Sequence, residues 1–293
     1  MDFSIVVPVY NKEKTLEACI NSLLAQDYTE GRYEIIFVNN NSTDNSCAII
    51  GRRPSLKLIH EKKQGSYAGR NAGIRQAEGS VVVFTDADIE VRRDWLKNIR
   101  SAFAKNNYDI LIGWCLPAVP VKLLEVHSLF IREKIKAALA QKDYRMLIAG
   151  AGNLAIKRSV FAAEGLFSAD SNSDDTNFVI RCCEKGYKAG FSDDIEARRN
   201  DISGIGIYLL KNFISGCSYV PESTGKPSLA ARLKNAGLLI KFMFRHFPVG
   251  LGMPVITLFY FMGNFLNRIG VIKPSIRQRL VLNYTNFMTK KGL

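Results

Sequence analysis

The feature that most constrains the fold is an alternation of short apolar runs with helix-type periodicity through the first hundred residues. Four apolar runs have the length of strands: residues 3–7, 34–38, 56–60 and 80–84. Between them, apolar side chains recur at helical spacing, as at Leu16, Ile20 and Leu23. Strands that alternate with helices in this way form βαβ units. The sequence therefore predicts an α/β fold, with a mostly parallel sheet flanked by helices.

Polar side chains follow the ends of three of these strands. Right-handed crossovers place the C-terminal ends of parallel strands on one edge of the sheet, and ligands of open α/β sheets bind along that edge. The segments expected there are residues 9–11, 39–41 and 85–88. We therefore expect a ligand site at this edge.

The segment FTDADIE, residues 84–90, delivers two carboxylates at the end of the fourth strand. In an extended chain residues two apart point the same way, so Asp86 and Asp88 are expected to face one small volume. Unpaired carboxylates there would repel each other, and a hard divalent cation that bridges to phosphate oxygens removes that repulsion. The alternative is a solvated strand end that caps the next helix.

Two further segments offer groups that suit a nucleotide. VNNNSTD, residues 38–44, carries amides that can hydrogen-bond a nucleobase, although an Asx-rich turn followed by a helix cap explains it equally. In QGSYAGRNAG, residues 64–73, Gly65 permits a close approach and Arg70 can bind a phosphate or a carboxylate in a fork. The alternative there is the start of a surface helix.

Asp174 and Asp175 are adjacent acids that precede a helix pattern. Proximity of like charges and partial burial raise the pKa of one member of such a pair, as a general base requires. The alternative is charge compensation at a helix N-terminus. No glycine-rich dinucleotide fingerprint and no P-loop motif occurs, which disfavours dinucleotide enzymes and P-loop NTPases.

Together these segments resemble the inverting nucleotide-sugar glycosyltransferases of family 2, which have the Rossmann-like GT-A fold. The matching pieces cover most of residues 3–190: SIVVPVYNKEKTLEACINSLLAQDY, YEIIFVNNNSTDNS, GSYAGRNAGIRQAEGSVVVFTDADIEVRRDWL and GAGNLAIKRSVF followed by SDDTNFVIRCCEKGY. The resemblance implies a catalytic domain over residues 1–225. It also implies metal-dependent transfer from a UDP-, GDP- or dTDP-sugar to a hydroxyl of a glycan or lipid-linked acceptor, in polysaccharide biosynthesis. The alternatives are a catalytically degenerate membrane-bound scaffold of this fold and a sugar nucleotidyltransferase.

Carried over position by position, the resemblance implies roles for individual residues. Asp175 would be the catalytic base, and Asp88 would hold Mn²⁺ or Mg²⁺ on the diphosphate. The donor-binding residues would be Pro8, Val9, Asn11, Asn40, Gly65, Arg70, Asp86 and Asp88.

Three positions depart from the family's usual pattern. Asn39 and Asn40 stand where an acidic pair is usual, which leaves the nucleobase open. Asn177 stands where a second aspartate is common, and Arg199 lies roughly where many members carry a histidine.

The C-terminal part of the chain is strongly basic. Of the net charge of +13, eleven positive charges fall after Glu222 without one Asp or Glu, which leaves +2 for the residues before them. Residues 247–266 are twenty uncharged residues, interrupted by Pro and Gly. We expect residues 226–293 to form a basic, hydrophobic helical region that attaches to an anionic membrane in a peripheral or re-entrant manner. The alternative is an apolar helix packed on the catalytic domain or in a homodimer interface.

The start of the chain lacks the pattern of a secretory leader, and no nucleic-acid recognition motif is visible. Together with the membrane-binding pattern, this predicts a location at the cytoplasmic face of the cell membrane and no nucleic-acid partner.

Overall fold

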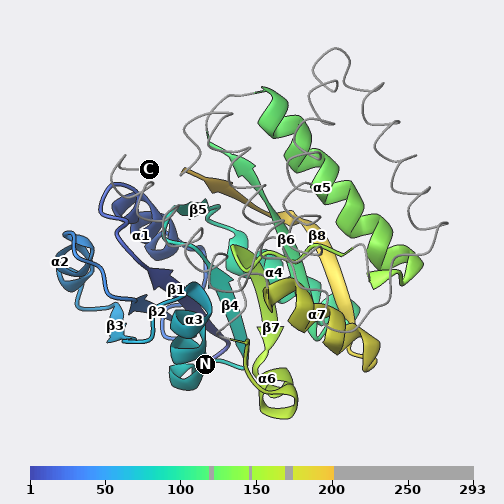
Figure 1. Cartoon of the computed structure of the whole chain (residues 1–293), viewed down its shortest axis with the longest axis horizontal. Coiled ribbons are helices and arrows are strands. Elements are labelled where there is room, and N and C mark those ends of the chain that lie inside the picture. The colour runs from blue at the N-terminus through green and yellow to red at the C-terminus, as the bar shows by residue number, and fades with distance from the viewer. Residues whose placement is uncertain (119–121, 145–146, 169–173, 201–293) are drawn as a thin grey trace, which may run out of the picture. The chain divides into compact units, whose positions relative to one another are not determined.

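The computed structural model shows a mixed α/β fold built on one sheet (Figure 1). It describes residues 1–118, 122–144, 147–168 and 174–200. Contacts divide the chain into two compact units, of which the first comprises Met1–Leu116, Ala149–Asp170 and Asp174–Asn200. The residues of the predicted site belong to this first unit.

Within the described residues the sheet has eight strands in the order β3-β2-β1-β4-β7-β6-β8-β5. Their bounds are β1 Phe3–Val9, β2 Tyr33–Asn39, β3 Lys57–His60, β4 Val81–Thr85, β5 Ile89–Val91, β6 Ile110–Pro117, β7 Asn153–Lys157 and β8 Ala189–Arg199. The neighbouring strands β3, β2, β1 and β4 pair in parallel. β7 is antiparallel to both β4 and β6, and β5 is antiparallel to β8. The predicted α/β fold is confirmed, and its parallel part is the N-terminal half of the sheet.

Helices cover both faces of the parallel strands. The helices are α1 Leu16–Leu24, α2 Ser46–Gly51, α3 Ser66–Gln76, α4 Trp95–Asn106, α5 Lys122–Gln141, α6 Arg158–Glu164 and α7 Asp174–Glu184. On one face, Ile5 and Val7 of β1 join the hydrophobic core with Ile20 of α1. On the other face, Val6 lies against Gly73 of α3, which crosses in front of these strands in Figure 1. This layering results from the alternation of side chains along a strand.

Strand β1 continues through Pro8, although the sequence predicts that it ends before this residue. The carbonyl of Val9 accepts a hydrogen bond from the amide of Asn40, on the β2 side. Successive residues of a strand present their backbone groups to opposite neighbours, so Pro8 lacks its N–H on the β4 side. The pairing of β1 with β4 has already ended at Val6, so the missing N–H of Pro8 costs no hydrogen bond between these strands.

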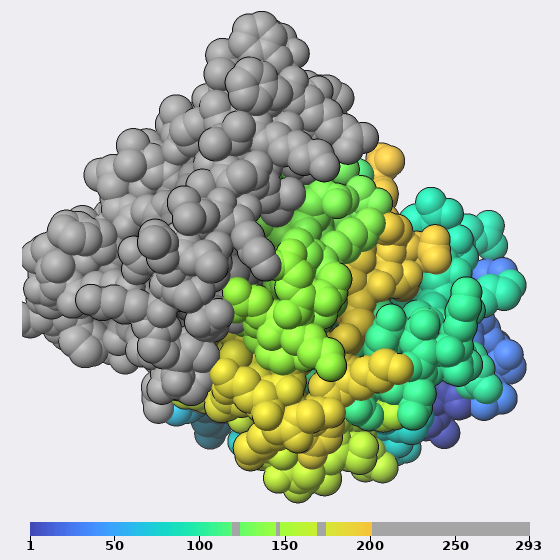
Figure 2. Space-filling view, turned by 90° about the vertical axis from the view of Figure 1, so that its right-hand side faces the viewer, coloured from blue at the N-terminus to red at the C-terminus, as the bar shows by residue number. Residues whose placement is uncertain are grey.

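Strand β8 pairs with β5 at the edge of the sheet opposite β3. It packs against α4, and the gold surface of β8 lies next to the teal surface of α4 in Figure 2. Its pairing with β5 places Ile89 opposite Arg199. This register puts Arg199 beside the turn that carries Asp86 and Asp88.

The predicted membrane-associating region lies outside the described residues, as does the predicted boundary between residues 225 and 226. In the part of the chain that the structure describes, no helix combines the length and hydropathy needed to cross a membrane. The predictions for residues 226–293 therefore stay predictions.

Candidate functional site

Asp86 and Asp88 lie in a tight turn between β4 and β5. The amide of Ile89 donates to the carbonyl of Asp86 at 3.0 Å, and Thr15 Oγ1 donates to the carbonyl of Ala87 at 3.1 Å. The extended geometry expected from the sequence is wrong for this segment. The two side chains converge because the chain turns and α1 holds the turn in place.

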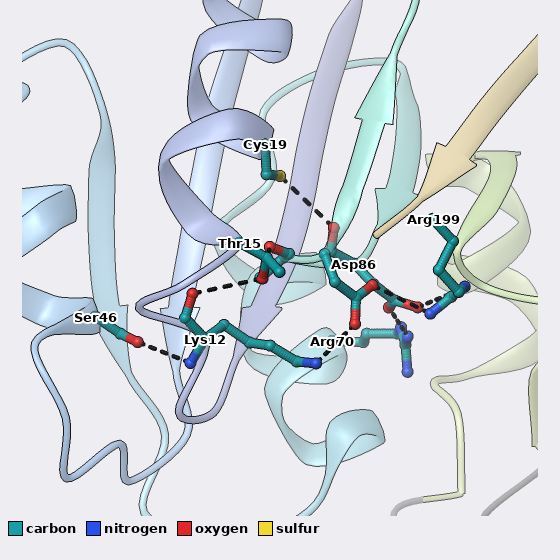
Figure 3. Close-up of polar contacts among 9 residues, drawn as sticks. Lys12, Thr15, Cys19, Ser46, Arg70, Asp86 and Arg199 are labelled. Carbon is teal, nitrogen blue, oxygen red and sulfur yellow. Dashed lines mark hydrogen bonds and ion pairs between the residues drawn. The ribbon is translucent and has the colours of Figure 1, made fainter. Parts of the chain in front are cut away.

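Three cationic side chains surround the two carboxylates (Figure 3). Asp86 Oδ1 contacts Arg70 Nη2 at 2.5 Å, and Asp86 Oδ2 contacts Arg199 Nη2 at 2.9 Å. Asp88 Oδ1 contacts Arg199 Nη1 at 3.1 Å, and Asp88 Oδ2 contacts Lys12 Nζ at 2.8 Å. We call these five residues the cation–carboxylate cluster. Each of its four carboxylate oxygens contacts a cationic nitrogen, and its formal charge is +1.

Two members of the cluster are buried, and the other three are partly exposed. Asp88 is 3% exposed and Arg70 is 6% exposed. Burial by itself raises the pKa of Asp86, but the positive charges of Arg70 and Arg199 outweigh it, so the pKa lies below its ordinary value. Asp86 is therefore anionic near neutral pH.

Asp175 stands at the N-terminus of α7, where its Oδ2 accepts a hydrogen bond of 2.8 Å from the amide of Ala151. Burial raises the pKa of Asp175, and the positive charge of Arg70 opposes this rise without cancelling it. Arg70 also lies over the ring of Tyr67, with its guanidinium carbon 5.2 Å from the ring centroid. The buried Nε of Arg70 makes no hydrogen bond among the described residues. Arg70 thus pairs with Asp86 and also acts electrostatically on Asp175.

Asp174 has a different environment from Asp175. It is 0% exposed, accepts a hydrogen bond from the amide of Ser168, and forms an ion pair with Arg181 at 3.4 Å. Asp174 thus contacts a backbone amide and a guanidinium. These contacts give Asp174 a structural role at the start of α7.

The predicted nucleotide-side residues connect the loops at the end of β1 and β2. Asn11 has a left-handed backbone with φ of 50°, and its Oδ1 accepts from the amide of Thr43 at 2.8 Å. Asn40 donates to the carbonyls of Glu61 and Lys63, at 3.0 and 2.7 Å.

Asn40 also accepts from the amide of Gly65 at 2.7 Å. Gly65 precedes α3 with φ of 133°, a conformation that favours glycine. Asn40 thus fixes the loop that begins α3, and its contact with a base stays a prediction.

Pro8 and Val9 end β1 at the same edge. The side chain of Val9 is 1% exposed and belongs to the hydrophobic core, so only its backbone can face a ligand. Pro8 is partly buried. Their roles in donor binding stay predictions.

The cluster does not fit a resident divalent metal as it stands. Mn²⁺ and Mg²⁺ require open oxygen ligands, and the four carboxylate oxygens of Asp86 and Asp88 already contact cationic nitrogens. In the described ranges no group of three or more His, Cys, Asp or Glu side chains could hold a metal ion. At the position where a ligand such as histidine could complete a site, the chain carries Arg199.

Two members of the cluster were not among the predicted site residues. Lys12 follows Asn11 in the loop after β1, and a lysine in a polar loop gives little signal in a sequence. Arg199 is 111 residues from Asp88 along the chain, and only the pairing of β8 with β5 brings the two together.

The fold and site correspond to a known family. The profile of glycosyl transferase family 2 matches residues 4–164, and the chain belongs to this family. Among curated proteins, glycosyltransferase AglE of Haloferax volcanii is 27% identical over 200 residues, which cover 66% of this chain and 64% of AglE. The poly(ribitol-phosphate) β-N-acetylglucosaminyltransferase TarS of Staphylococcus aureus is 32% identical over 117 residues, 38% of this chain and 20% of TarS.

Solved structures show the same fold. The mannosyltransferase PcManGT of Pyrobaculum calidifontis, in complex with GDP-Man and Mn²⁺, has a TM-score of 0.62 and 19% identity, covering 95% of this chain and 84% of that one. Residues 1–349 of S. aureus TarS in complex with UDP-GlcNAc give a TM-score of 0.53 and 21% identity, covering 84% of this chain and 73% of that one. The predicted GT-A fold class is thereby confirmed.

Proposed function

We propose that this chain is a glycosyltransferase that moves a sugar from a nucleotide-sugar donor to a hydroxyl of a glycan or glycolipid acceptor, with inversion at the anomeric carbon. Family membership and the nucleotide sugars bound by PcManGT and TarS support a donor of this class. The observation that supports the proposal most is the position of Arg70, which contacts Asp86 and whose positive charge opposes, without cancelling, the rise that burial causes in the pKa of Asp175. An acid suited to be a base thus stands close to the acids of the cluster.

The proposed step follows from the charges of these residues. Asp175 accepts the proton of the acceptor hydroxyl as its oxygen attacks the anomeric carbon. The bond between that carbon and the diphosphate oxygen breaks, and the nucleoside diphosphate leaves with the electron pair. Asp86 orients Arg70 and Arg199, while the loops at Asn11, Asn40 and Gly65 border the nucleotide.

The assignment of Mn²⁺ or Mg²⁺ to Asp88 is a finer part of the sequence prediction. The Mn²⁺ complex of PcManGT supports a divalent ion in that protein. The ion pairs of Asp88 with Lys12 and Arg199 do not favour it in this chain, so no step above depends on a metal.

Binding of nucleotides to the full-length protein tests the proposed donor class. UDP, GDP and dTDP are titrated calorimetrically, and a ligand that binds only the folded protein also raises the thermal unfolding midpoint. We expect at least one diphosphate to bind more tightly than its nucleoside, because the cluster is positively charged. If none of the three binds, the proposal is wrong.

We also propose that residues 226–293 attach the protein to the cytoplasmic face of an anionic membrane. Their eleven basic residues, without an acidic one, support this. The full-length protein should float with phosphatidylglycerol vesicles at low salt, ignore phosphatidylcholine vesicles, and lose most of this binding near 1 M salt, where the Debye length is about 3 Å. Equal binding to both kinds of vesicle would contradict electrostatic attachment.

A further inference from the structure

We propose that Arg199, which bridges Asp86 and Asp88, takes the place of a divalent cation in this chain, and that with Lys12 it stabilises the departing diphosphate. The inference rests on the proposed function, and it predicts that nucleotide binding and sugar transfer proceed without a metal ion. It departs from the metal dependence that the family resemblance implies. The ion pairs within the cluster support this inference.

The position of Arg199 is built into the fold. The antiparallel pairing of β5 with β8 fixes its backbone opposite Ile89, and the amide of Asn200 donates to the carbonyl of Asp88 at 2.8 Å. The side chain of Arg199 is 19% exposed and its guanidinium bridges both carboxylates. Its location therefore depends on strand register and is not that of a surface side chain that meets an acid by chance.

Gly152 leaves the space that the guanidinium fills. A Cβ at this position would lie 2.6 Å from Arg199 Nη2 and 3.1 Å from Asp86 Oδ2, both closer than ordinary contact. Two separate segments, the glycine-rich turn before β7 and the end of β8, thus meet where the absence of a side chain leaves room for the guanidinium. This second observation agrees with a dedicated role for Arg199.

The charge of the cluster suits a diphosphate without further cations. Two carboxylates and three cations give a formal charge of +1, which attracts an anion and repels a divalent cation. A metal ion that bound Asp88 would also have to displace Lys12 or Arg199 from it. Because like charges repel, the net positive charge of the cluster opposes the binding of a divalent cation before the donor arrives.

The chemistry of the guanidinium fits the leaving group. When the bond between the sugar and the diphosphate breaks, negative charge grows on the phosphate oxygens. An arginine has five N–H donors in a planar fork that matches phosphate, and it cannot lose its charge near neutral pH. Lys12, whose side chain is 22% exposed, provides a second positive charge on the more open side. Both can stabilise the diphosphate electrostatically as it departs.

The test measures UDP and GDP affinity of the full-length protein by calorimetry, in EDTA and then in Mn²⁺. We expect the nucleotide that binds to do so in EDTA with an affinity within about threefold of that in Mn²⁺. Arg199→Gln should weaken binding in EDTA at least about tenfold, as for loss of a charged contact of about 1.4 kcal/mol. The matched control is Arg198→Gln, which removes the same charge from the neighbouring exposed residue and should change affinity less than twofold.

Two further variants make the result independent of the folding of Arg199→Gln. Arg199→Lys keeps the charge but loses the fork, so it should lie between the wild type and Arg199→Gln. Arg199→His offers an imidazole beside two carboxylates, so its nucleotide binding should become stimulated by Mn²⁺.

The outcomes separate the two proposals. Strict dependence of wild-type binding on Mn²⁺, or wild-type affinity in folded Arg199→Gln or Arg199→Lys in EDTA, would overturn the role of Arg199 while leaving the transferase proposal intact. Absence of UDP, GDP and dTDP binding in both EDTA and Mn²⁺ would overturn the transferase proposal itself, and the inference with it.

Discussion

The substitution Gly152→Ala tests whether the packing around Arg199 matters for the site. The new Cβ would lie 2.6 Å from Arg199 Nη2 and 2.9 Å from Ile89 Cδ1. Ordinary contact begins near 3.4 Å, so the guanidinium has to retreat by about 0.8 Å. A retreat of that size away from the Cβ lengthens the 2.9 Å contact with Asp86 Oδ2 and weakens it.

The expected magnitude follows from which atoms have to move. Overpacking a buried site costs about 1–3 kcal/mol. The atoms that the Cβ meets are the ends of the Arg199, Ile89 and Asp86 side chains, so we expect the lower part of that range, about 1–2 kcal/mol. The weakening of the Arg199 bridge should appear mainly in function, as a fall of up to about tenfold in affinity for UDP or GDP, equal to about 1.4 kcal/mol.

Urea unfolding and nucleotide calorimetry measure the two effects. Gly150→Ala is the matched control, because a Cβ at Gly150 meets nothing within 4 Å. Gly150→Ala should therefore leave stability within about 0.5 kcal/mol of the wild type and leave affinity unchanged. If Gly152→Ala behaves like Gly150→Ala in both measurements, the proposed packing of Arg199 is wrong.

Three further predictions concern Asp174, the pH dependence of sugar transfer and the pH dependence of stability. Asp174→Asn should lower the free energy of unfolding, measured with urea, by about 1–3 kcal/mol, because Arg181 and the amide of Ser168 lose a buried charged partner. The same substitution should leave nucleotide affinity unchanged. Unaltered stability would contradict the structural role of Asp174. The rate of sugar transfer should fall as the pH drops through a pKa above the ordinary aspartate value of about 3.9, because Asp175 accepts a proton only when ionised and burial raises its pKa. A pH–rate profile without an acidic limb above pH 4 would refute this. Asp86 behaves oppositely in stability: its lowered pKa stabilises the fold above its unfolded pKa, and this contribution is lost as the pH falls through the folded value.

The periodicity of apolar residues predicted the parallel half of the sheet. It did not predict strands β6 and β8. β1, β2, β3, β4, α1 and α7 appear where the sequence predicts them, within a few residues. β8 was missed because most of its side chains are polar or charged, and only Ile195 and Ala197 show the alternation of a buried face. β6 was missed although its sequence ILIGWCLP is an apolar run that could have indicated a strand.

The site was predictable where its residues lie next to a strand end, and less so where distant segments meet. Asp86, Asp88 and Arg70 were found because strand ends and a helix start mark them in the sequence. The contacts of Arg199 with Asp86 and Asp88 depend on the β5–β8 register, which no local pattern specifies. For the same reason the sequence favoured a metal between the two acids, where the structure has an arginine.

In the proposed reaction Asp175 is the base for transfer of a sugar from its nucleotide. The most direct test of this role measures the release of UDP from UDP-GlcNAc and of GDP from GDP-Man, by the wild type and by Asp175→Asn, with water or an added glycan as acceptor. We expect release from at least one donor by the wild type, and a rate at least about 100-fold lower for Asp175→Asn with affinity for the diphosphate nearly unchanged. Equal rates for the two proteins, or a wild type that binds a diphosphate yet releases none from either donor, would contradict this role.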